Sequence, residues 1–402
     1  MGLLGVACLA ISAAGCAATA PGSPSSSGTS TSSASPPVTP APTGTPSCGI
    51  LTELSSWSVA RLAAQLVVVP AQETDVAAAA PSVAAGAGGV ILFGSSAPSD
   101  LGAQLHSLAA EAEGGLAPVV MTDEEGGGVQ RMANLVGSIP WPAEMSAGMT
   151  PSAVYQLAKQ TGAAMAADGV TMDLAPVLDL AAGPGPDALH TDGPRSFGLS
   201  PQIATTYGIA FAEGLEAGGV IPVVKHFPGE GSATANTDDS PASTPPLTAL
   251  EAADLLPFEA AVRAGLPAVM VGNASVPGLT SQPASLSAAA IIGLLRNQLG
   301  FTGMVMTDSL SANAIGAIGL SVPQAVVEAV AAGADMVLYN SDSPNTTFQQ
   351  VIAQMVAAVS DHQLPESTLI NAVVQVLVTK GVNLCAGAAA GGAAQPAPTP
   401  VG

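Results

Sequence analysis

The chain has 402 residues, of which 48% are hydrophobic, enough apolar side chains for one large core or two ordinary ones. Eight Lys and Arg stand against 29 Asp and Glu, so the formal net charge is -21. A surface this acidic does not attract a nucleic-acid backbone or anionic lipid headgroups by charge. We therefore expect no nucleic-acid partner.

The N-terminal segment predicts a lipoprotein signal peptide over residues 1–16. It is an apolar run that ends in small residues, and the motif Ala-Ala-Gly before Cys16 resembles the lipobox at which such a cysteine is acylated. The usual basic start is missing, and the alternative is a short buried helix. On the main interpretation the protein is extracytoplasmic and is held at the cell membrane through the lipid on Cys16 only.

Residues 17–47 are mostly Ser, Thr, Pro, Gly and Ala without apolar periodicity, which predicts a disordered tether, and residues 386–402 predict a disordered tail. The folded part is then 48–385. Cys48 and Cys385 bracket it, and in an oxidising compartment such a pair predicts a disulfide that closes the domain. The alternative is two unrelated thiols.

Within the folded part, short apolar runs with β-branched residues alternate with longer Ala-rich segments. Eight strands are expected at 66–70, 89–93, 118–122, 171–175, 221–225, 268–272, 304–307 and 335–339, and helices include 100–112, 151–167, 201–217 and 250–264. A doubly wound sheet has the same alternation. The count of eight, and no Gly-x-Gly-x-x-Gly turn after the first strand, favour an α/β fold of the (β/α)8 TIM-barrel type with a single catalytic domain.

Polar residues stand where five of these strands end. The third strand is followed by Asp123, the fourth runs on to Asp179 and the fifth ends in Lys225 and His226. The sixth precedes Asn273 and the seventh precedes Asp308. The carboxyl ends of barrel strands carry the active site, so these groups are expected to converge at one rim.

Several motifs together resemble glycoside hydrolase family 3, in particular its single-domain bacterial β-N-acetylglucosaminidase branch. They are VVMTDEEGGGVQRM, VTMDLAPVLDL, PRSFG, VVKHFPGEG, DLLPFEAAV, PASLS and LGFTGMVMTDSLSANAI, in family order over about 54–382. The resemblance implies retaining hydrolysis of terminal β-linked N-acetylglucosamine, with a carbohydrate carrying a terminal N-acetylhexosamine as partner. Peptidoglycan turnover is one setting for such an enzyme.

The resemblance also assigns roles to single residues. Asp308 matches the nucleophile that forms a covalent glycosyl intermediate, although an Asp at this point could instead cap the following helix. The sugar-binding positions of the family fall on Asp123, Arg131, Arg195, Lys225 and His226. For any one of these cations the alternative is an internal ion pair with Asp123 or Asp179.

The pattern breaks at the acid/base. Family members carry an Asp-Ser-His element after Lys-His-Phe-Pro-Gly, whereas this chain has Asp239, Ser240 and Pro241, and proline cannot transfer a proton. The candidates for that role are His190, Glu230 and the two carboxylates Asp238 and Asp239 of the same loop. His190 could equally be a loop histidine without a role.

A smaller departure lies in the loop after the third strand, where Gly128 stands in place of a family arginine, which puts contacts beyond the first sugar in doubt. Two rival functions remain: a non-catalytic sugar-binding lipoprotein on the same barrel, and a β-glucosidase or β-xylosidase. No cofactor is implied. No metal is expected either, because the histidines lack ligand spacing such as His-x-x-x-His.

Overall fold

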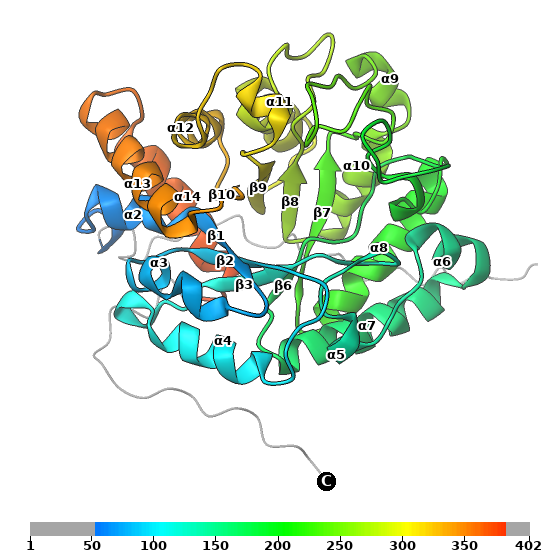
Figure 1. Ribbon diagram of the computed structural model, residues 1–402. Helices are drawn as coiled ribbons and strands as arrows, with labels where there is room; N and C mark the ends of the chain where they lie inside the picture. The colour runs from blue at the N-terminus through cyan, green and yellow to red at the C-terminus, as the bar shows by residue number, and fades with distance from the viewer. Residues whose placement is uncertain (1–52, 383–402) are drawn as a thin grey trace, which may run out of the picture. The chain divides into compact units, whose positions relative to one another are not determined.

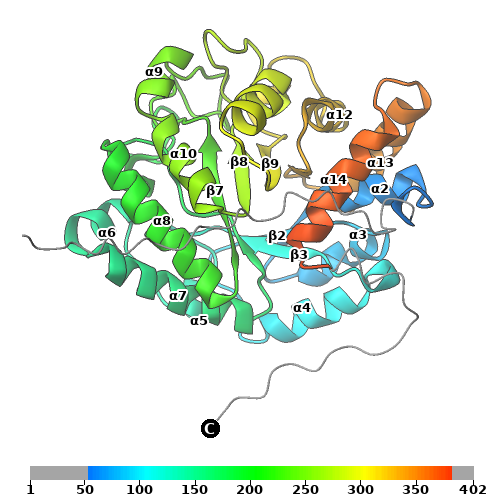
Figure 2. The same ribbon diagram turned by 180° about the vertical axis from the view of Figure 1, so that it is seen from behind.

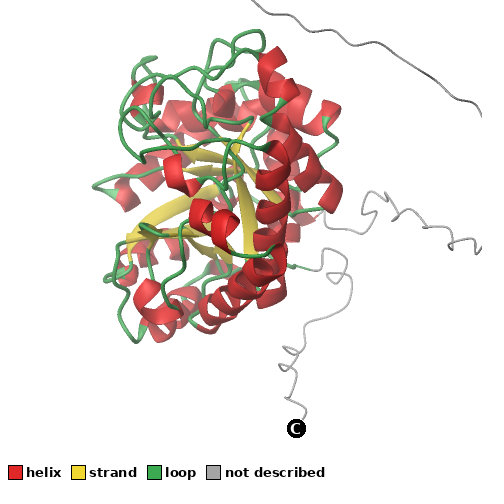
Figure 3. Cartoon of the chain, turned by 90° about the vertical axis from the view of Figure 1, so that its right-hand side faces the viewer, coloured by secondary structure: helices red, strands yellow, loops and turns green. Residues whose placement is uncertain are grey.

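The structure is a computed structural model, and it describes residues 53–382. Eight parallel strands close into a barrel in the order β1-β10-β9-β8-β7-β6-β3-β2, and Figure 3 shows them in yellow with red helices around them. The strands are β1 (Val67–Gln72), β2 (Gly89–Phe93), β3 (Val119–Thr122), β6 (Met172–Asp173), β7 (Ile221–Phe227), β8 (Ala268–Val271), β9 (Met304–Ser309) and β10 (Met336–Leu338). The predicted TIM-type barrel is confirmed, with all eight strands in the expected order.

One small hairpin was not predicted. It joins β4 (Glu124–Gly126) to β5 (Val129–Gln130) in an antiparallel pair directly after β3. Strands of two and three residues leave no alternating pattern long enough to read in a sequence. The hairpin matters because it carries one of the carboxylates of the cavity described below.

The helices are α2 (Val59–Gln65), α3 (Ala80–Ala84), α4 (Leu101–Ala110), α5 (Ala133–Val136), α6 (Pro142–Gly148), α7 (Pro151–Ala167), α8 (Pro201–Gly218), α9 (Leu247–Ala252), α10 (Leu255–Ala264), α11 (Asn313–Gly316), α12 (Val322–Ala332), α13 (Pro344–Ser360) and α14 (Glu366–Thr379). A π-helix spans Ala289–Gln298, and short 3-10 turns occur at Val76–Ala79, Glu113–Gly115, Gly193–Arg195 and Ala284–Leu286. Figure 1 shows the longer helices arranged outside the strands.

Local sequence explains two long helices, α7 and α8. The side chain of Thr150 caps α7 and that of Ser200 caps α8, each accepting a hydrogen bond from the backbone N–H three residues on, and each helix has proline in its first turn. Gly219 then ends α8 with a left-handed φ of 92°. These signals are local, and the expected helices 151–167 and 201–217 agree with α7 and α8 to within one residue.

The prediction of a single helix over 250–264 is wrong. It is two helices, α9 and α10, because Ala253 leaves the helical region with φ -145° and ψ -65°. Pro257 has no N–H to donate to the preceding turn, so it is accommodated in the first turn of a new helix rather than in the middle of a long one.

Methionine side chains fill the inside of the barrel. Met121, Met172, Met270 and Met336 are all buried. A Cβ placed on Gly89 would lie 3.1 Å from the terminal methyl groups of both Met121 and Met336. The missing side chain of Gly89 therefore gives two long methionines room to meet across the barrel.

The two ends of the described chain lie side by side. Helix α2 packs against α13 and α14, which is visible from both sides in Figures 1 and 2. Among residues 53–382, no helix has the length and apolar character needed to cross a bilayer. The predicted signal peptide with Cys16, the tether, the tail, and both Cys48 and Cys385 lie outside the described residues, so these remain predictions.

Candidate active site

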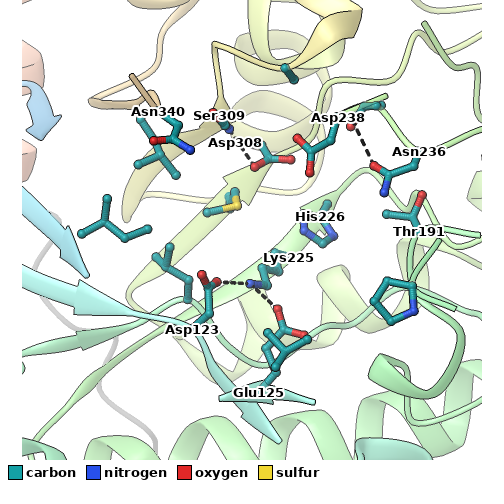
Figure 4. A pocket seen from close by; sticks show the side chains of 18 of the residues that line it. Asp123, Glu125, Thr191, Lys225, His226, Asn236, Asp238, Asp308, Ser309 and Asn340 are labelled. Carbon is teal, nitrogen blue, oxygen red and sulfur yellow. Dashed lines mark hydrogen bonds and ion pairs between the residues drawn. The ribbon is translucent and has the colours of Figure 1, made fainter. Parts of the chain in front are cut away.

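A cavity of about 460 Å³ opens at the carboxyl ends of the barrel strands. Figure 4 shows its polar side chains pointing toward one another. All six residues predicted as nucleophile or sugar ligands line it: Asp123, Arg131, Arg195, Lys225, His226 and Asp308. Other lining side chains include Phe93, Glu125, Thr191, Asn236, Thr237, Asp238, Met270, Ser309, Ser311 and Asn340. Residues from seven barrel strands and the loops that follow them thus meet at the predicted rim.

A buried ion-pair cluster forms one wall of the cavity. Lys225 Nζ lies 2.8 Å from Asp123 Oδ1 and 2.6 Å from Glu125 Oε1. Burial by itself would raise the pKa of Asp123, but the charges of Lys225 and Arg131 outweigh it and hold that pKa below its usual value. The same cluster keeps the pKa of Lys225 raised. Asp123 is therefore ionised and ready to accept hydrogen bonds from hydroxyl groups.

Arg195 extends this cluster. Its Nε and Nη2 each lie 2.7 Å from an oxygen of Glu125, a bidentate pair, and its Nη1 lies 3.3 Å from Asp192 Oδ1. The Arg195 and Lys225 charges overcome burial and drive the pKa of Glu125 far below its usual value. Arg131 makes a longer contact, 3.5 Å, with Asp123 Oδ2. Lys225 and Arg131 thus form the internal ion pair with Asp123 that was weighed as an alternative, whereas Arg195 pairs with Glu125 and Asp192. All three cations still line the cavity.

His226 is oriented by Asp179. Asp179 Oδ2 accepts from the backbone N of His226 at 3.0 Å and lies 2.7 Å from Nδ1 of its ring. Burial lowers the pKa of His226, although the charge of Asp308 acts in the opposite direction. The contact with Asp179 occupies Nδ1, which leaves Nε2 as the nitrogen free to meet a ligand.

One group of metal-ligating side chains lies close together among residues 53–382. Ligand atoms of Asp179, Asp192 and His226 are all within 4.8 Å of one another. However, the closest of these atoms already bond to each other, and the Arg195 guanidinium places a positive charge beside Asp192. Burial and the charge of Asp179 raise the pKa of Asp192 to about 7. We assign no cation here, because a proton held by Asp192 satisfies the same group.

Asp308 stands at the end of β9 with its side chain half-buried in the cavity wall. Its Oδ1 accepts from the backbone N of Ser309 at 2.7 Å. Burial and the nearby charge of Asp238 raise the pKa of Asp308, while His226 and Lys225 act to lower it. The position is that of a carboxylate exposed to a ligand on one side and held by the backbone on the other.

The comparisons with known proteins identify this arrangement. The family described as "Glycosyl hydrolase family 3 N terminal domain" matches residues 60–379. The chain belongs to glycosyl hydrolase family 3. Among its relatives is the protein named Beta-hexosaminidase LpqI from Mycobacterium tuberculosis, 39% identical over 280 residues that cover 68% of this chain and 70% of that protein.

Solved structures of family 3 proteins have the same fold. That of LpqI from M. tuberculosis aligns with a TM-score of 0.75 at 36% identity, covering 84% of this chain and 98% of that one. A β-N-acetylhexosaminidase from Beutenbergia cavernae aligns with a TM-score of 0.74 at 31% identity, covering 81% of this chain and 99% of that one. The chain is thus similar in fold and sequence to family 3 proteins over its barrel.

Of the four residues named as acid/base candidates, only Asp238 lines the cavity of this family 3 chain, and Glu230, His190 and Asp239 do not. Glu230 is buried, with Oε1 accepting from the backbone N of Ala274 at 2.7 Å. His190 is exposed and pairs with Asp187 at 3.0 Å. Asp239 is exposed in the loop after β7. Spacing along the chain placed all three near the rim, but it could not determine which way each side chain points.

Glu125 and Asp192 also belong to this ion-pair cluster, although no role was predicted for either of them. Glu125 forms ion pairs with both Lys225 and Arg195, and Asp192 forms a second ion pair with Arg195. The signal for Glu125 was present: it lies two residues after Asp123 in a turn that follows a barrel strand. Asp192 had no comparable signal, because it lies far along the irregular segment between β6 and α8 rather than at the end of a strand.

Proposed function

We propose that this chain hydrolyses terminal β-linked N-acetylhexosamine, with Asp308 as the nucleophile of a retaining mechanism. One observation carries the proposal: the Asp308 carboxylate faces the same cavity as Asp123, Lys225 and His226. The names of the relatives, which include a Beta-hexosaminidase 39% identical to this chain and a β-N-acetylhexosaminidase of known structure, support the choice of sugar.

In the proposed mechanism one set of cavity residues binds the sugar and Asp308 attacks it. The ionised Asp123, the Lys225 ammonium and Nε2 of His226 are suited to grip neighbouring hydroxyl groups of one sugar ring. That grip holds the anomeric carbon against Asp308, whose carboxylate oxygen attacks it. Water then hydrolyses the glycosyl ester and restores the original anomer.

The first experiment measures release of the phenol from an aryl N-acetyl-β-glucosaminide. Asp308→Ala is expected to lower kcat by about 10⁴-fold or more, because the covalent route is lost with the nucleophile. A wild-type protein that binds N-acetylglucosamine but releases no phenol would instead support the sugar-binding lipoprotein. Release unchanged by Asp308→Ala would rule out Asp308 as nucleophile.

A second comparison addresses the sugar. The aryl β-glucoside and β-xyloside of the same phenol are expected to be turned over much more slowly than the N-acetyl-β-glucosaminide. Equal or greater kcat/KM for either one would favour the β-glucosidase or β-xylosidase interpretation. The identity of the phenol is kept constant so that only sugar recognition changes.

We also propose that Cys16 carries the lipid that holds this hydrolase at the cell membrane, outside the cytoplasm. The support is the lipobox-like sequence before Cys16 and the tether-like composition after it. In a bacterial host, Cys16→Ser is expected to prevent labelling by a fatty-acid analogue and to move the protein from the membrane fraction to a soluble one. Membrane retention without label would contradict the proposal. A hydrolase held there would act on wall peptidoglycan.

A further inference from the structure

The loop after β7 brings a carboxylate to the place where this chain lacks the expected histidine. Pro241 is exposed and does not line the cavity. Asp238, three residues earlier in the same loop, does line it. Figure 4 shows the Asp238 carboxylate pointing toward that of Asp308. Two carboxyl groups, one from the loop after β7 and one from the end of β9, therefore lie near each other in the wall of the same cavity.

The backbone of this loop is fixed rather than left to side-chain contacts alone. The carbonyl of Asp238 accepts from the backbone N of Asn313 at 3.2 Å, and that of Thr237 accepts from Ala314 N at 3.0 Å. Both donors belong to α11, which follows β9 and Asp308 directly. Two of the free N–H groups at the start of α11 thus hold the Asp238 loop beside the nucleophile.

Asn236 holds the backbone of Asp238 in place. Its Oδ1 accepts from the backbone N of Asp238 at 3.0 Å, which closes a tight side-chain turn. The backbone N of Asn236 donates to the carbonyl of Ala188 at 3.1 Å, which ties the turn to the loop after β6. Asp239, the next residue, shares this backbone but is not part of the cavity wall.

We propose that Asp238 is the general acid and base of this hydrolase. The proposal rests on the function proposed above and adds the residue that the sequence pattern leaves out. Of the carboxyl groups that line the cavity, Asp123 and Glu125 are held ionised by Lys225 and its neighbouring arginines, and Asp308 is assigned to attack. Asp238 is the remaining carboxyl group in the cavity wall.

The proposed reaction has two steps, transfer of the sugar to Asp308 and hydrolysis of the resulting ester. Asp238 gives its proton to the glycosidic oxygen as the bond from that oxygen to the anomeric carbon breaks and an Asp308 oxygen bonds to the carbon. The aglycone leaves as an alcohol, and Asp238 is now a carboxylate. It then takes a proton from a water whose oxygen attacks the anomeric carbon, the ester to Asp308 breaks, and both carboxyl groups return to their starting states.

The surrounding charges suit Asp238 to hold that proton. Partial burial and the negative charges of Asp239 and Asp123 raise the pKa of Asp238, against the opposing charge of Arg195. Asp308, which faces it, has Lys225 and His226 as neighbouring cations or donors that favour its ionised form. Burial and the charge of Asp238 raise the pKa of Asp308 as well, so the two carboxyl groups favour a state in which the pair holds one proton. In the proposed mechanism Asp238 carries that proton.

The test uses the full-length protein and aryl N-acetyl-β-glucosaminides with good and poor leaving groups. Asp238→Ala is expected to lower kcat/KM by about 10²- to 10⁴-fold for a poor leaving group and far less for a good one, which needs no proton. Added sodium azide should accelerate the variant on the good leaving group and yield the β-glycosyl azide. Asp238→Asn, which keeps the shape of the side chain, should give the same dependence on leaving group.

Asp239→Ala is the matched control, because it removes a neighbouring carboxylate from the same loop. It is expected to stay within about twofold of wild type and to show no azide product. Leaving-group dependence and azide product in Asp239→Ala but not in Asp238→Ala would overturn the proposal. So would wild-type rates for Asp238→Asn on a poor leaving group.

These results separate the two proposals. If wild type releases no phenol, or Asp308→Ala is as active as wild type, the proposed function fails. If release depends on Asp308 but neither Asp238 variant shows leaving-group dependence or azide rescue, only the role of Asp238 fails. Asn236→Ala is expected to give a milder loss of the same leaving-group-dependent kind, since it loosens Asp238 without removing its carboxyl group.

Discussion

Lys225 forms ion pairs with both Asp123 and Glu125 in the buried cluster of the cavity wall. Its side chain is 3% exposed and lies within 2.8 Å of both Asp123 and Glu125. Glu125 in turn is held by Arg195, so the cluster alternates positive and negative groups across three loops. Burying these charges is costly, and they remain ionised because each has partners of opposite sign.

Replacing Lys225 should therefore destabilise the protein as well as weaken sugar binding. Lys225→Ala leaves two buried carboxylates without their common partner, and we expect the free energy of unfolding to fall by about 3–5 kcal/mol. Lys159→Ala is the control, because Lys159 is exposed on α7 and should change the free energy by less than about 0.5 kcal/mol. Urea unfolding measures both, and equal effects would contradict the assigned role of Lys225.

At the scale of elements, glycines set how closely α7 and α8 pack. A Cβ on Gly214 of α8 would lie 2.5 Å from the carbonyl oxygen of Tyr155 and 2.8 Å from Cβ of Ala158, both on α7. The two helices contact each other along most of their length, as Figure 2 also shows. Helix α7 leads into β6, which carries Asp173, and α8 leads into β7, which carries Lys225 and His226.

Gly214→Ala is expected to push α7 and α8 apart and to destabilise the fold by about 1–3 kcal/mol, the usual result of overpacking. Gly293→Ala is the control within another helix, where the nearest atom to the new Cβ is 3.8 Å away. There the better helix propensity of alanine should stabilise by up to about 1 kcal/mol. Thermal unfolding of the two variants should shift in opposite directions, and a destabilised Gly293→Ala would contradict this account.

Across the whole molecule, buried carboxyl groups link stability to pH. Burial raises the pKa of Asp179 to about 6, that of Asp192 to about 7 and that of Asp335 to about 6. An unfolded aspartate titrates near about 3.9. Because the folded state holds these protons more tightly, their contribution to stability is full below about pH 4 and is lost as pH rises through the folded pKa values.

We therefore expect the free energy of unfolding to fall as pH rises from about 4 to about 7. Denaturant titrations in about 0.5 M salt would measure it, since salt at this level screens the repulsion among exposed acidic groups. Asp192→Asn keeps the acceptor for Arg195 but removes one titrating group, so its pH slope should be smaller than that of wild type. An unchanged slope would mean that Asp192 does not hold a proton in the folded protein.

Much of this molecule follows from local sequence. Barrel strands buried on both faces read as unbroken apolar runs, as at Gly89–Phe93, and capped helices such as Pro151–Ala167 carry their own start signals. Because the barrel brings the carboxyl ends of its strands to one rim, Asp123, Lys225, His226 and Asp308 could be placed together before any side chain was located. Their family motifs added the roles.

What the tertiary structure decided is the direction of side chains that share a loop. Glu230, Asp238 and Asp239 follow the same strand, yet the first points into a buried backbone contact, the second into the cavity and the third to solvent. That difference comes from hydrogen bonds to Asn236 and to the start of α11, which lie outside any local pattern. The sequence by itself determined the barrel and the place of Asp308 at its rim, while long-range backbone contacts decided which carboxyl group of the loop after β7 lines the cavity beside it.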